Sequence, residues 1–318
     1  MSIFRITLTG LLIATGVLIC AFSLFGCLGR FWWGFELATH FRVQYAITLG
    51  GISLTLLVWQ HLRWAAVFIA FAGLNAMLVA SRLPLTPVEA EAQGTGPVFR
   101  ALLANVNSTN RDDQRIRDTI LHLDPDFVLL LEATPWLLDR LTDLADRYPQ
   151  RIAAPREDNF GIALLSRRPF LHADIVPIGA AGLPSIVAEF AVGQHRFNVL
   201  GTHPLPPIGE ELAHGRNDQL ARLAEFARHS QQPLLLLGDL NLSPWSPYFD
   251  QLLTSSGLHD GGHGRGILPS WPAGWLPLWI PIDHALFSAG IHIRQLEIGS
   301  DIGSDHYPVI VDFQVVGS

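Results

Sequence analysis

Ser304-Asp305-His306-Tyr307-Pro308 leads directly into an apolar run at residues 309–313. An Asp-His pair at the start of a strand places a carboxylate beside an imidazole, so that one group can hold a hard metal ion while the other moves a proton. Two further polar clusters adjoin apolar runs, because Gly238-Asp239-Leu240-Asn241 follows residues 233–237 and Asp283-His284 follows a third apolar stretch. Polar clusters on the ends of three strands predict one shared active-site edge.

The chain has 318 residues and divides into unlike parts. Residues 1–82 are nearly all apolar and predict a membrane anchor, residues 83–96 are rich in Pro, Glu and Gly and predict a linker, and residues 97–318 predict one catalytic domain. That domain has 16 arginines and 25 acidic residues, a net charge of −9, and the chain contains no lysine. Such an acidic domain is a poor partner for duplex DNA, so a small or lipid-bound phosphodiester fits its charge better.

Three apolar segments predict three transmembrane helices, at Ile6–Leu28, Gln44–Trp59 and Trp64–Ala80. The first is long enough to cross a bilayer, which takes about 20 residues, and the other two are shorter and form a tight hairpin. Three successive segments argue against a cleaved signal peptide. A transporter is disfavoured, because the segments contain no Asp or Lys and no paired charges of the kind that transport needs.

The order of these segments places the catalytic domain on the side of the membrane opposite the N-terminus. Short N-termini of bacterial membrane proteins are usually cytoplasmic, which favours a multi-pass protein of the inner (cytoplasmic) membrane with an extracytoplasmic, periplasmic catalytic domain. The arginines slightly oppose this orientation, because Arg5 and Arg63 would lie inside while Arg30, Arg42 and Arg82 would lie outside.

Strands and helices alternate along the catalytic domain, but strands also come in runs. Apolar runs predict strands at residues 99–106, 127–131, 161–165, 185–190, 197–200 and 234–237. Helical spacing of apolar residues predicts helices at residues 114–123, 135–147 and 217–229. This order is typical of a sandwich of mixed sheets with helices on the outside.

Polar residues fall at or just beyond these apolar runs, and they form the candidate site. They are Asn105, Glu132, His203, Asp239, Asn241, Asp283, Asp305 and His306. Glu132 and Asp305 together with amide oxygens suit Mg²⁺, which prefers a few oxygen ligands and keeps several waters. His203 and His306 supply two imidazoles for proton transfer to water and to the leaving group.

Asp283 or Asp239 would orient an imidazole or the attacking water. Each residue also has a purely structural explanation: Glu132 could be a solvated strand end, residues 202–204 a turn, and Asp239 the start of an Asx turn. The ordered set as a whole, rather than any one member, favours a catalytic site.

The ordered set resembles the endonuclease/exonuclease/phosphatase superfamily, which includes deoxyribonuclease-type nucleases, neutral sphingomyelinases and inositol-polyphosphate phosphatases. The resemblance covers residues 98–313, and the combination of Gly-Asp-Leu-Asn at 238–241 with Ser-Asp-His-Tyr-Pro-Val at 304–309 is specific. It implies an α/β fold, a four-layer sandwich of two mixed sheets flanked by helices, preceded here by three transmembrane helices. It also implies Mg²⁺-dependent phosphoester hydrolysis, with Mn²⁺ as an alternative ion.

The resemblance also implies roles for the metal-site residues. Glu132 resembles the principal metal ligand, and Asn105 and Asp305 lie near the metal in this interpretation. The chain departs from some nuclease branches at Asn107, where they have an Asp near the metal, so a metal contact at that position is in doubt.

The remaining residues take catalytic roles by the same resemblance. His306 resembles the imidazole that acts on water or phosphate, oriented by Asp283. His203 resembles the second histidine on the leaving-group side, and Asp239 and Asn241 position the nucleophile and the phosphate.

A tryptophan-rich loop precedes Asp283. Trp271, Trp275 and Trp279 lie between residues 268 and 282 among four prolines. Their rings would suit the headgroup region of a bilayer beside the site, and the alternative is that they pack onto the sandwich.

These observations predict a membrane-anchored, Mg²⁺-dependent phosphoester hydrolase, a phosphodiesterase acting on a membrane-proximal lipid or small phosphodiester. One alternative is an extracytoplasmic endonuclease or exonuclease, although nucleic acid is not favoured by the charge. Another is a catalytically silent binding module tethered to the membrane. The expected partners are the lipid bilayer, through the N-terminal helices, and the phosphodiester substrate, and no feature of the sequence specifies an oligomeric state.

Overall fold

The computed structural model describes residues 7–82, 96–193 and 195–316. It begins with a bundle of helices, the N-terminal bundle: α1 (Leu8–Cys27), α2 (Trp33–Leu37), η1 (Ala38–Phe41), α3 (Arg42–Val58) and α4 (Leu62–Ala80). Three stretches of this bundle are long and apolar enough to cross a membrane, and they are Leu8–Cys27, Trp33–Val58 and Leu62–Ala80. The second starts at Trp33 rather than at the predicted Gln44, because α2 and η1 continue directly into α3. The linker predicted at residues 83–96 lies, except for Gly96, outside the described residues.

A polar cluster joins the three long helices of the bundle. The buried Arg42 guanidinium, at the start of α3, donates to the carbonyl oxygen of Ser23 on α1 (2.8 Å) and to Oδ1 of Asn75 on α4 (3.1 Å). The Asn75 amide in turn donates to Ser23 Oγ (2.7 Å). Polar groups in apolar surroundings are costly unless they are hydrogen-bonded, so this cluster favours one arrangement of the helices.

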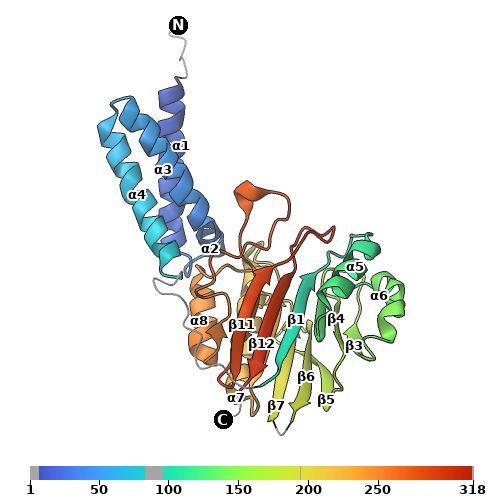
Figure 1. The fold of residues 1–318 in the computed structure, drawn as a ribbon. Helices are drawn as coiled ribbons and strands as arrows, with labels where there is room; N and C mark the ends of the chain where they lie inside the picture. Colours follow the sequence, from blue (N-terminus) through green and yellow to red (C-terminus); the bar gives the residue numbers. More distant parts are fainter. Residues whose placement is uncertain (1–6, 83–95, 194, 317–318) are drawn as a thin grey trace.

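Two six-stranded sheets form the rest of the molecule (Figure 1). The first has the order β11 (Ile291–Ile298), β12 (Val309–Val315), β1 (Val98–Asn105), β2 (Phe127–Leu131), β4 (Ile162–Ser166), β3 (Gln150–Ala154). The second has the order β5 (His172–Pro177), β6 (Pro184–Val192), β7 (His195–Thr202), β8 (Leu234–Asp239), β10 (Asp283–Phe287), β9 (His259–Asp260). Both sheets are mixed, because β1 pairs with β2 and β7 with β8 in parallel while the other pairs are antiparallel.

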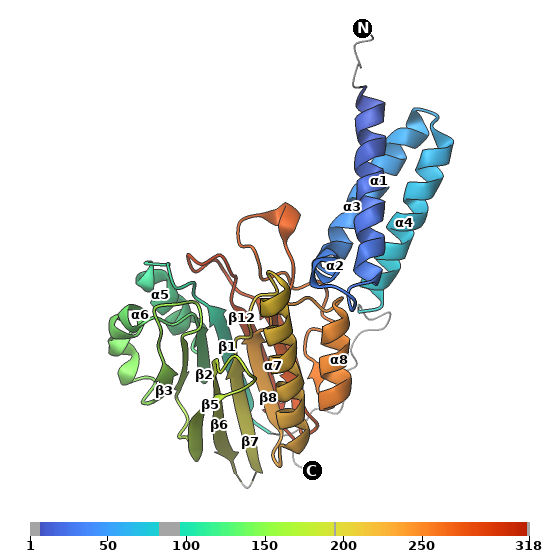
Figure 2. The ribbon, with the colours of Figure 1, turned by 180° about the vertical axis from the view of Figure 1, so that it is seen from behind.

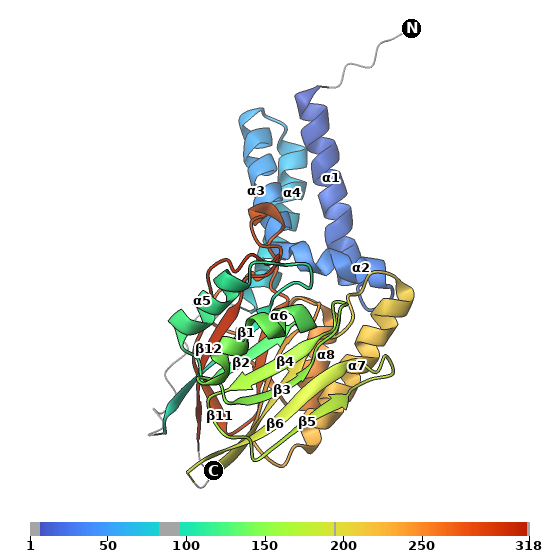
Figure 3. The same ribbon diagram turned by 90° about the vertical axis from the view of Figure 1, so that its right-hand side faces the viewer.

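Helices cover the outer face of each sheet (Figures 2 and 3). They are α5 (Asp113–Leu123), α6 (Pro135–Arg140) and η2 (Thr142–Ala145) on the first sheet, and α7 (Glu210–His229) and α8 (Pro247–Ser256) on the second. Side chains alternate along the strands, so that Ala101 and Leu103 of β1 enter the core between the sheets while Leu102 and Ala104 face α5. The predicted four-layer sandwich with two mixed sheets is confirmed.

Several predicted elements have different bounds in the structure. The helix predicted at residues 135–147 ends at Arg140 and is followed by the short η2, and α7 begins at Glu210 rather than at residue 217. Strands β3 and β5 were not predicted, because these edge strands are only partly buried and lack a continuous apolar run. Asp283 starts β10 instead of following a strand, so that part of the prediction is wrong.

Candidate active site

The topology brings strand ends from both sheets to one edge of the sandwich. In the first sheet β1 and β2 run parallel, so Asn105 and Glu132 lie at the same edge, and the antiparallel β12 begins there just after His306. In the second sheet Asp239 at the end of β8 pairs directly with Asp283 at the start of β10. Because β10 is antiparallel to β8, a residue that starts one strand meets a residue that ends the other. The predicted shared edge therefore exists, although Asp283 lies there as the first residue of a strand and not after the end of one.

Asn105 joins the two sheets at this edge. Its Nδ2 donates to Glu132 Oε1 on the first sheet and to Asp239 Oδ2 on the second, both at 3.1 Å. The backbone amide of Ser108 holds the other Glu132 oxygen, Oε2, at 2.9 Å. Asn105, Glu132 and Asp239 are all buried, which contradicts the alternative that Glu132 is a solvated strand end.

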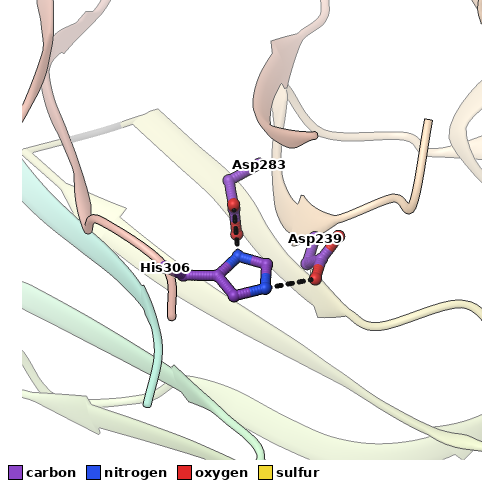
Figure 4. Close-up of side chains that lie close together, drawn as sticks. All are labelled: Asp239, Asp283 and His306. Atoms are coloured by element: carbon purple, nitrogen blue, oxygen red, sulfur yellow. Dashed lines mark hydrogen bonds and ion pairs between the residues drawn. The ribbon is translucent and has the colours of Figure 1, made fainter. Parts of the chain in front are cut away.

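His306 lies between two carboxylates (Figure 4). Its Nδ1 is 2.8 Å from Asp283 Oδ2, and its Nε2 is 3.6 Å from Asp239 Oδ2. Burial lowers the pKa of His306, but the carboxylates of Asp283 and Asp239 outweigh burial and raise the pKa to about 10. The imidazolium form is therefore the favoured one at neutral pH. Ser304 holds the backbone of His306 against β1, because its Oγ donates to the Asn105 carbonyl and accepts from the His306 backbone amide.

His203 approaches the same Asp239 oxygen from the end of β7. Its Nε2 is 3.5 Å from Asp239 Oδ2, and the ring of Phe160 lies beside it, with 5.6 Å between the centroids. Burial lowers the pKa of His203, but the hydrogen bond to Asp239 and the charge of that carboxylate raise it above its ordinary value. Burial raises the pKa of Asp239, but His306 and His203 outweigh it and lower the pKa to about 2. One ionised carboxylate thus faces two imidazoles.

Backbone strain is concentrated around these side chains. Five non-glycine residues among the described residues have a positive φ, and three of them belong to this edge, Asn107 (59°), Glu132 (59°) and Asn241 (53°). Such conformations cost energy and persist where surrounding contacts hold them, which is common at functional sites. Two hydrogen bonds hold Asn241 in this conformation: its backbone amide donates to Asp239 Oδ1 (2.9 Å) and its side chain donates to the carbonyl of Pro204 (2.9 Å).

Asp305 lies on the exposed side of the cluster. Its carboxylate accepts from the side-chain amide of Asn107 (2.7 Å) and from the indole N–H of Trp271 (3.2 Å). Asn107 stands where some nuclease branches have an Asp. In this structure its side-chain amide orients Asp305. All eight candidate residues therefore lie on one edge, and their individual roles stay predictions.

The donor set suits a hard divalent cation. Carboxylate oxygens of Glu132 and Asp239 flank the Asn105 amide, and rotation of that amide by 180° about its last side-chain torsion would present oxygen at the same point. Within the described part of the chain, Asp239, Asp283 and His306 also have ligand atoms within 4.8 Å of one another. In that second cluster both imidazole nitrogens already face carboxylates, so it is better suited to moving a proton than to holding an ion. Glu132 and Asn105, with Asp239 beside them, fit the ion best.

The sequence did not identify every residue that shapes this edge. Ser108 donates its backbone amide to Glu132 and its hydroxyl to Asn159 Oδ1 (2.6 Å), which fixes the wall beside Glu132. Small polar residues in loops give no pattern that would distinguish them from ordinary turns. His284, next to Asp283, is buried, and its Nε2 lies 2.8 Å from the carbonyl oxygen of Leu242.

Comparison with curated proteins finds no match. Among solved structures, the human Nocturnin catalytic domain with bound sulfate anion is 18% identical, covers 70% of this chain and 96% of its own, and has a TM-score of 0.57. D. rerio TDP2 complexed with single strand DNA product is 16% identical, with 69% and 99% covered and a TM-score of 0.56. Sphingomyelinase C from Streptomyces griseocarneus is 21% identical, with 68% and 99% covered and a TM-score of 0.52.

At these low identities, the solved structures show only that this chain has the same fold. The family is shown by a match of the sequence itself. The model of the Endonuclease/Exonuclease/phosphatase family matches residues 102–306, a range that begins in β1 and ends at His306. The match therefore includes more than half of the chain and every candidate residue of the edge. The protein belongs to the endonuclease/exonuclease/phosphatase family.

Proposed function

We propose that this hydrolase of phosphoester bonds is a metal-dependent phosphodiesterase, held in a membrane by its N-terminal bundle and acting on the headgroup phosphodiester of a membrane lipid. The observation that carries the proposal is the direction of the active-site edge. The edge with Asn105, Asp239 and His306 is the one from which the N-terminal bundle extends (Figures 1 and 3). A substrate phosphodiester at the membrane surface would therefore meet the catalytic residues directly.

The loop at residues 268–282 supports this orientation. It contains η3 (Leu276–Leu278) and rises from the active-site edge beside the N-terminal bundle, drawn in orange in Figure 1. Gln44, near the start of α3, donates to the carbonyl of Trp279 (2.7 Å) and ties the loop to the bundle. The tip is apolar and open, since Trp275 is 68% exposed and Leu276 is 67% exposed.

The three tryptophans of this loop behave differently. Trp271 donates to Asp305 and lies beside the His306 ring, and Trp279 packs edge-on against Tyr307. Trp275 alone of the three is at the exposed tip, with Leu276 next to it. Of the three tryptophans, only Trp275 is therefore placed for the predicted bilayer contact, together with the neighbouring Leu276. Trp271 and Trp279 pack onto the sandwich, as the alternative proposed.

The N-terminal bundle also supports an extracytoplasmic site. Its first helix begins at the end far from the sandwich (Figure 1), so with three crossings a cytoplasmic N-terminus would place the catalytic residues outside. The net charge of −9 in residues 97–318 and the absence of lysine favour a lipid over duplex DNA. A nuclease remains an outcome of the experiment that follows.

Replacement of Trp275 and Leu276 together by Ser is expected to lower hydrolysis of vesicle phospholipid about 30-fold, because each of the two lost apolar contacts with the interface costs about 1 kcal/mol. The full chain is reconstituted in phospholipid vesicles and release of the phosphorylated headgroup is measured. Hydrolysis of bis(4-nitrophenyl) phosphate, which needs no interface, should stay within about twofold of wild type on the same reasoning.

Leu171 supplies the matched control, since it is 50% exposed but lies next to β5, towards the opposite edge of its sheet. Leu171→Ser should leave lipid hydrolysis unchanged. Supercoiled plasmid is assayed in parallel with each variant. If plasmid is nicked faster than lipid is cleaved and the loop variant loses nothing on vesicles, the lipid proposal is wrong and a nuclease takes its place.

A further inference from the structure

A completely buried ion pair connects the N-terminal bundle to the catalytic sandwich. Glu36 on α2 and Arg216 on α7 both have 0% exposed side chains, and Arg216 Nη2 lies 2.5 Å from Glu36 Oε2. The second Glu36 oxygen accepts from the hydroxyl of Ser246 (2.7 Å). A buried charge is strongly unfavourable without its partner, so each member of this pair depends on the other.

Arg216 also reaches the loop that directly follows Asp239. Its Nη1 donates to the backbone carbonyl of Asn241 (3.1 Å), and its Nε donates to Asn217 Oδ1 (2.7 Å). The planar guanidinium thus holds Glu36 and Asn241 at once, in directions set by its rigid geometry. Ser243 on the same loop is 2.9 Å, Oγ to Nδ1, from His40 of η1, so two residues of the N-terminal bundle face residues 240–246.

Asn241 is a position where such support has consequences for the site. It has a left-handed backbone (φ 53°), its amide fixes Asp239 Oδ1, and its side chain holds the Pro204 carbonyl next to His203. A shift of this residue would move the carboxylate that faces both imidazoles. Misplacement of catalytic groups by about 1 Å can cost about 10²-fold in rate.

We propose that Glu36 is a positioning residue: through Arg216 it sets Asn241 and thereby Asp239, so that catalytic competence depends on the docked N-terminal bundle. Docking of the N-terminal bundle onto the sandwich would not by itself require a contact with Asn241. The exposed ion pair between Arg82 and Asp250 joins the same two parts of the chain without touching residues 239–241. The inference rests on the proposed phosphodiesterase function for its kinetic readout only.

The test uses the full chain in detergent micelles and the soluble substrate bis(4-nitrophenyl) phosphate, so that access to lipid plays no part. Glu36→Gln removes the charge and keeps the shape, and kcat is expected to fall about 10-fold or more with KM within about twofold. Arg82→Ala is the matched control, because it breaks the other ion pair between the same parts, and its kcat should stay within about twofold of wild type by the same comparison.

Hydrogen–deuterium exchange of the peptide covering residues 238–246 gives a readout that does not need activity. Exchange there should rise in Glu36→Gln and stay at the wild-type level in Arg82→Ala. Glu36→Asp keeps the charge but withdraws it by one methylene, so it should fold and show an intermediate effect even where Glu36→Gln does not fold. Equal exchange in wild type and in a folded Glu36 variant would overturn the inference.

The paired exchange Glu36→Arg with Arg216→Glu separates positioning from docking. It restores an ion pair between the two parts, but it presents a carboxylate to the Asn241 carbonyl, which can no longer be held. Positioning predicts that unfolding temperature recovers relative to Glu36→Gln while kcat stays low, and full recovery of kcat would overturn it. Failure of wild type on every phosphodiester would overturn the proposed function instead, while the exchange measurement would still decide the inference.

Discussion

Replacement of His306 by Asn is expected to lower kcat by about 10²- to 10⁴-fold, the range that a positioned acid or base contributes. The imidazole lies 2.8 Å from Asp283 and 3.6 Å from Asp239, and those carboxylates raise its pKa to about 10. Asn can keep a hydrogen bond to Asp283 but has no proton to exchange in this range. The loss should therefore appear in kcat rather than in KM.

The measurement is the steady-state rate on bis(4-nitrophenyl) phosphate with the full chain in detergent. His292→Asn serves as control, because His292 lies on β11 opposite Gln314, away from the active-site edge. That variant should retain the wild-type rate. A His306→Asn protein that is folded and still turns over within about tenfold of wild type would contradict the acid–base role that this geometry supports.

The central strands and their edge could be predicted from the sequence because burial on both faces leaves a readable pattern. Residues 127–131 and 234–237 are continuous apolar runs, and they form β2 and most of β8, with every residue buried. Polar residues directly after such runs are conspicuous, which is why Glu132 and Asp239 were found. Edge strands such as β5 carry mostly exposed side chains, so no comparable pattern marks them.

The supports of the site could not be predicted in this way. Glu36 and Arg216 are 180 positions apart, and neither has a neighbour pattern that distinguishes it from a surface charge. Their pairing depends on where α2 packs against α7, which is a property of the tertiary structure. Asn241 was predicted to position the nucleophile and phosphate, but the need for a left-handed backbone there, and for Arg216 to hold it, appears only with the fold.

The direction of the site is the most useful information that the structure adds to the sequence. In the sequence, residues 83–96 separate the predicted anchor from the catalytic domain, and such a linker by itself would allow any orientation of the active site. Contacts of Glu36, His40 and Gln44 with the loops around the site restrict that freedom, because each joins the N-terminal bundle to the active-site edge. The domain is therefore held with the carboxylates of its active-site edge towards the bundle rather than away from it.

Removal of divalent cations is expected to reduce hydrolysis by more than about 10³-fold, and added Mg²⁺ should restore it. Such an ion, when bound, would neutralise negative charge that develops on the phosphoryl oxygens. Glu132 would hold it together with Asn105, whose amide lies 3.1 Å from carboxylate oxygens of both Glu132 and Asp239. Activity is measured after treatment with EDTA and then with Mg²⁺ or Mn²⁺ added back.

Glu132→Gln tests the same site without a chelator. The substitution keeps the hydrogen bond from the Ser108 amide but removes a negative charge from an oxygen-rich site, so affinity for Mg²⁺ should fall about 10- to 100-fold. Isothermal titration calorimetry measures this affinity directly, and Glu225→Gln on the exposed face of α7 is the matched control. Full activity in EDTA, or unchanged Mg²⁺ affinity in Glu132→Gln, would leave the two carboxylates around Asn105 without an ion to hold. Catalysis would then have to depend on the proton-transfer groups of the edge, among them His306 and His203 with Asp239 between them.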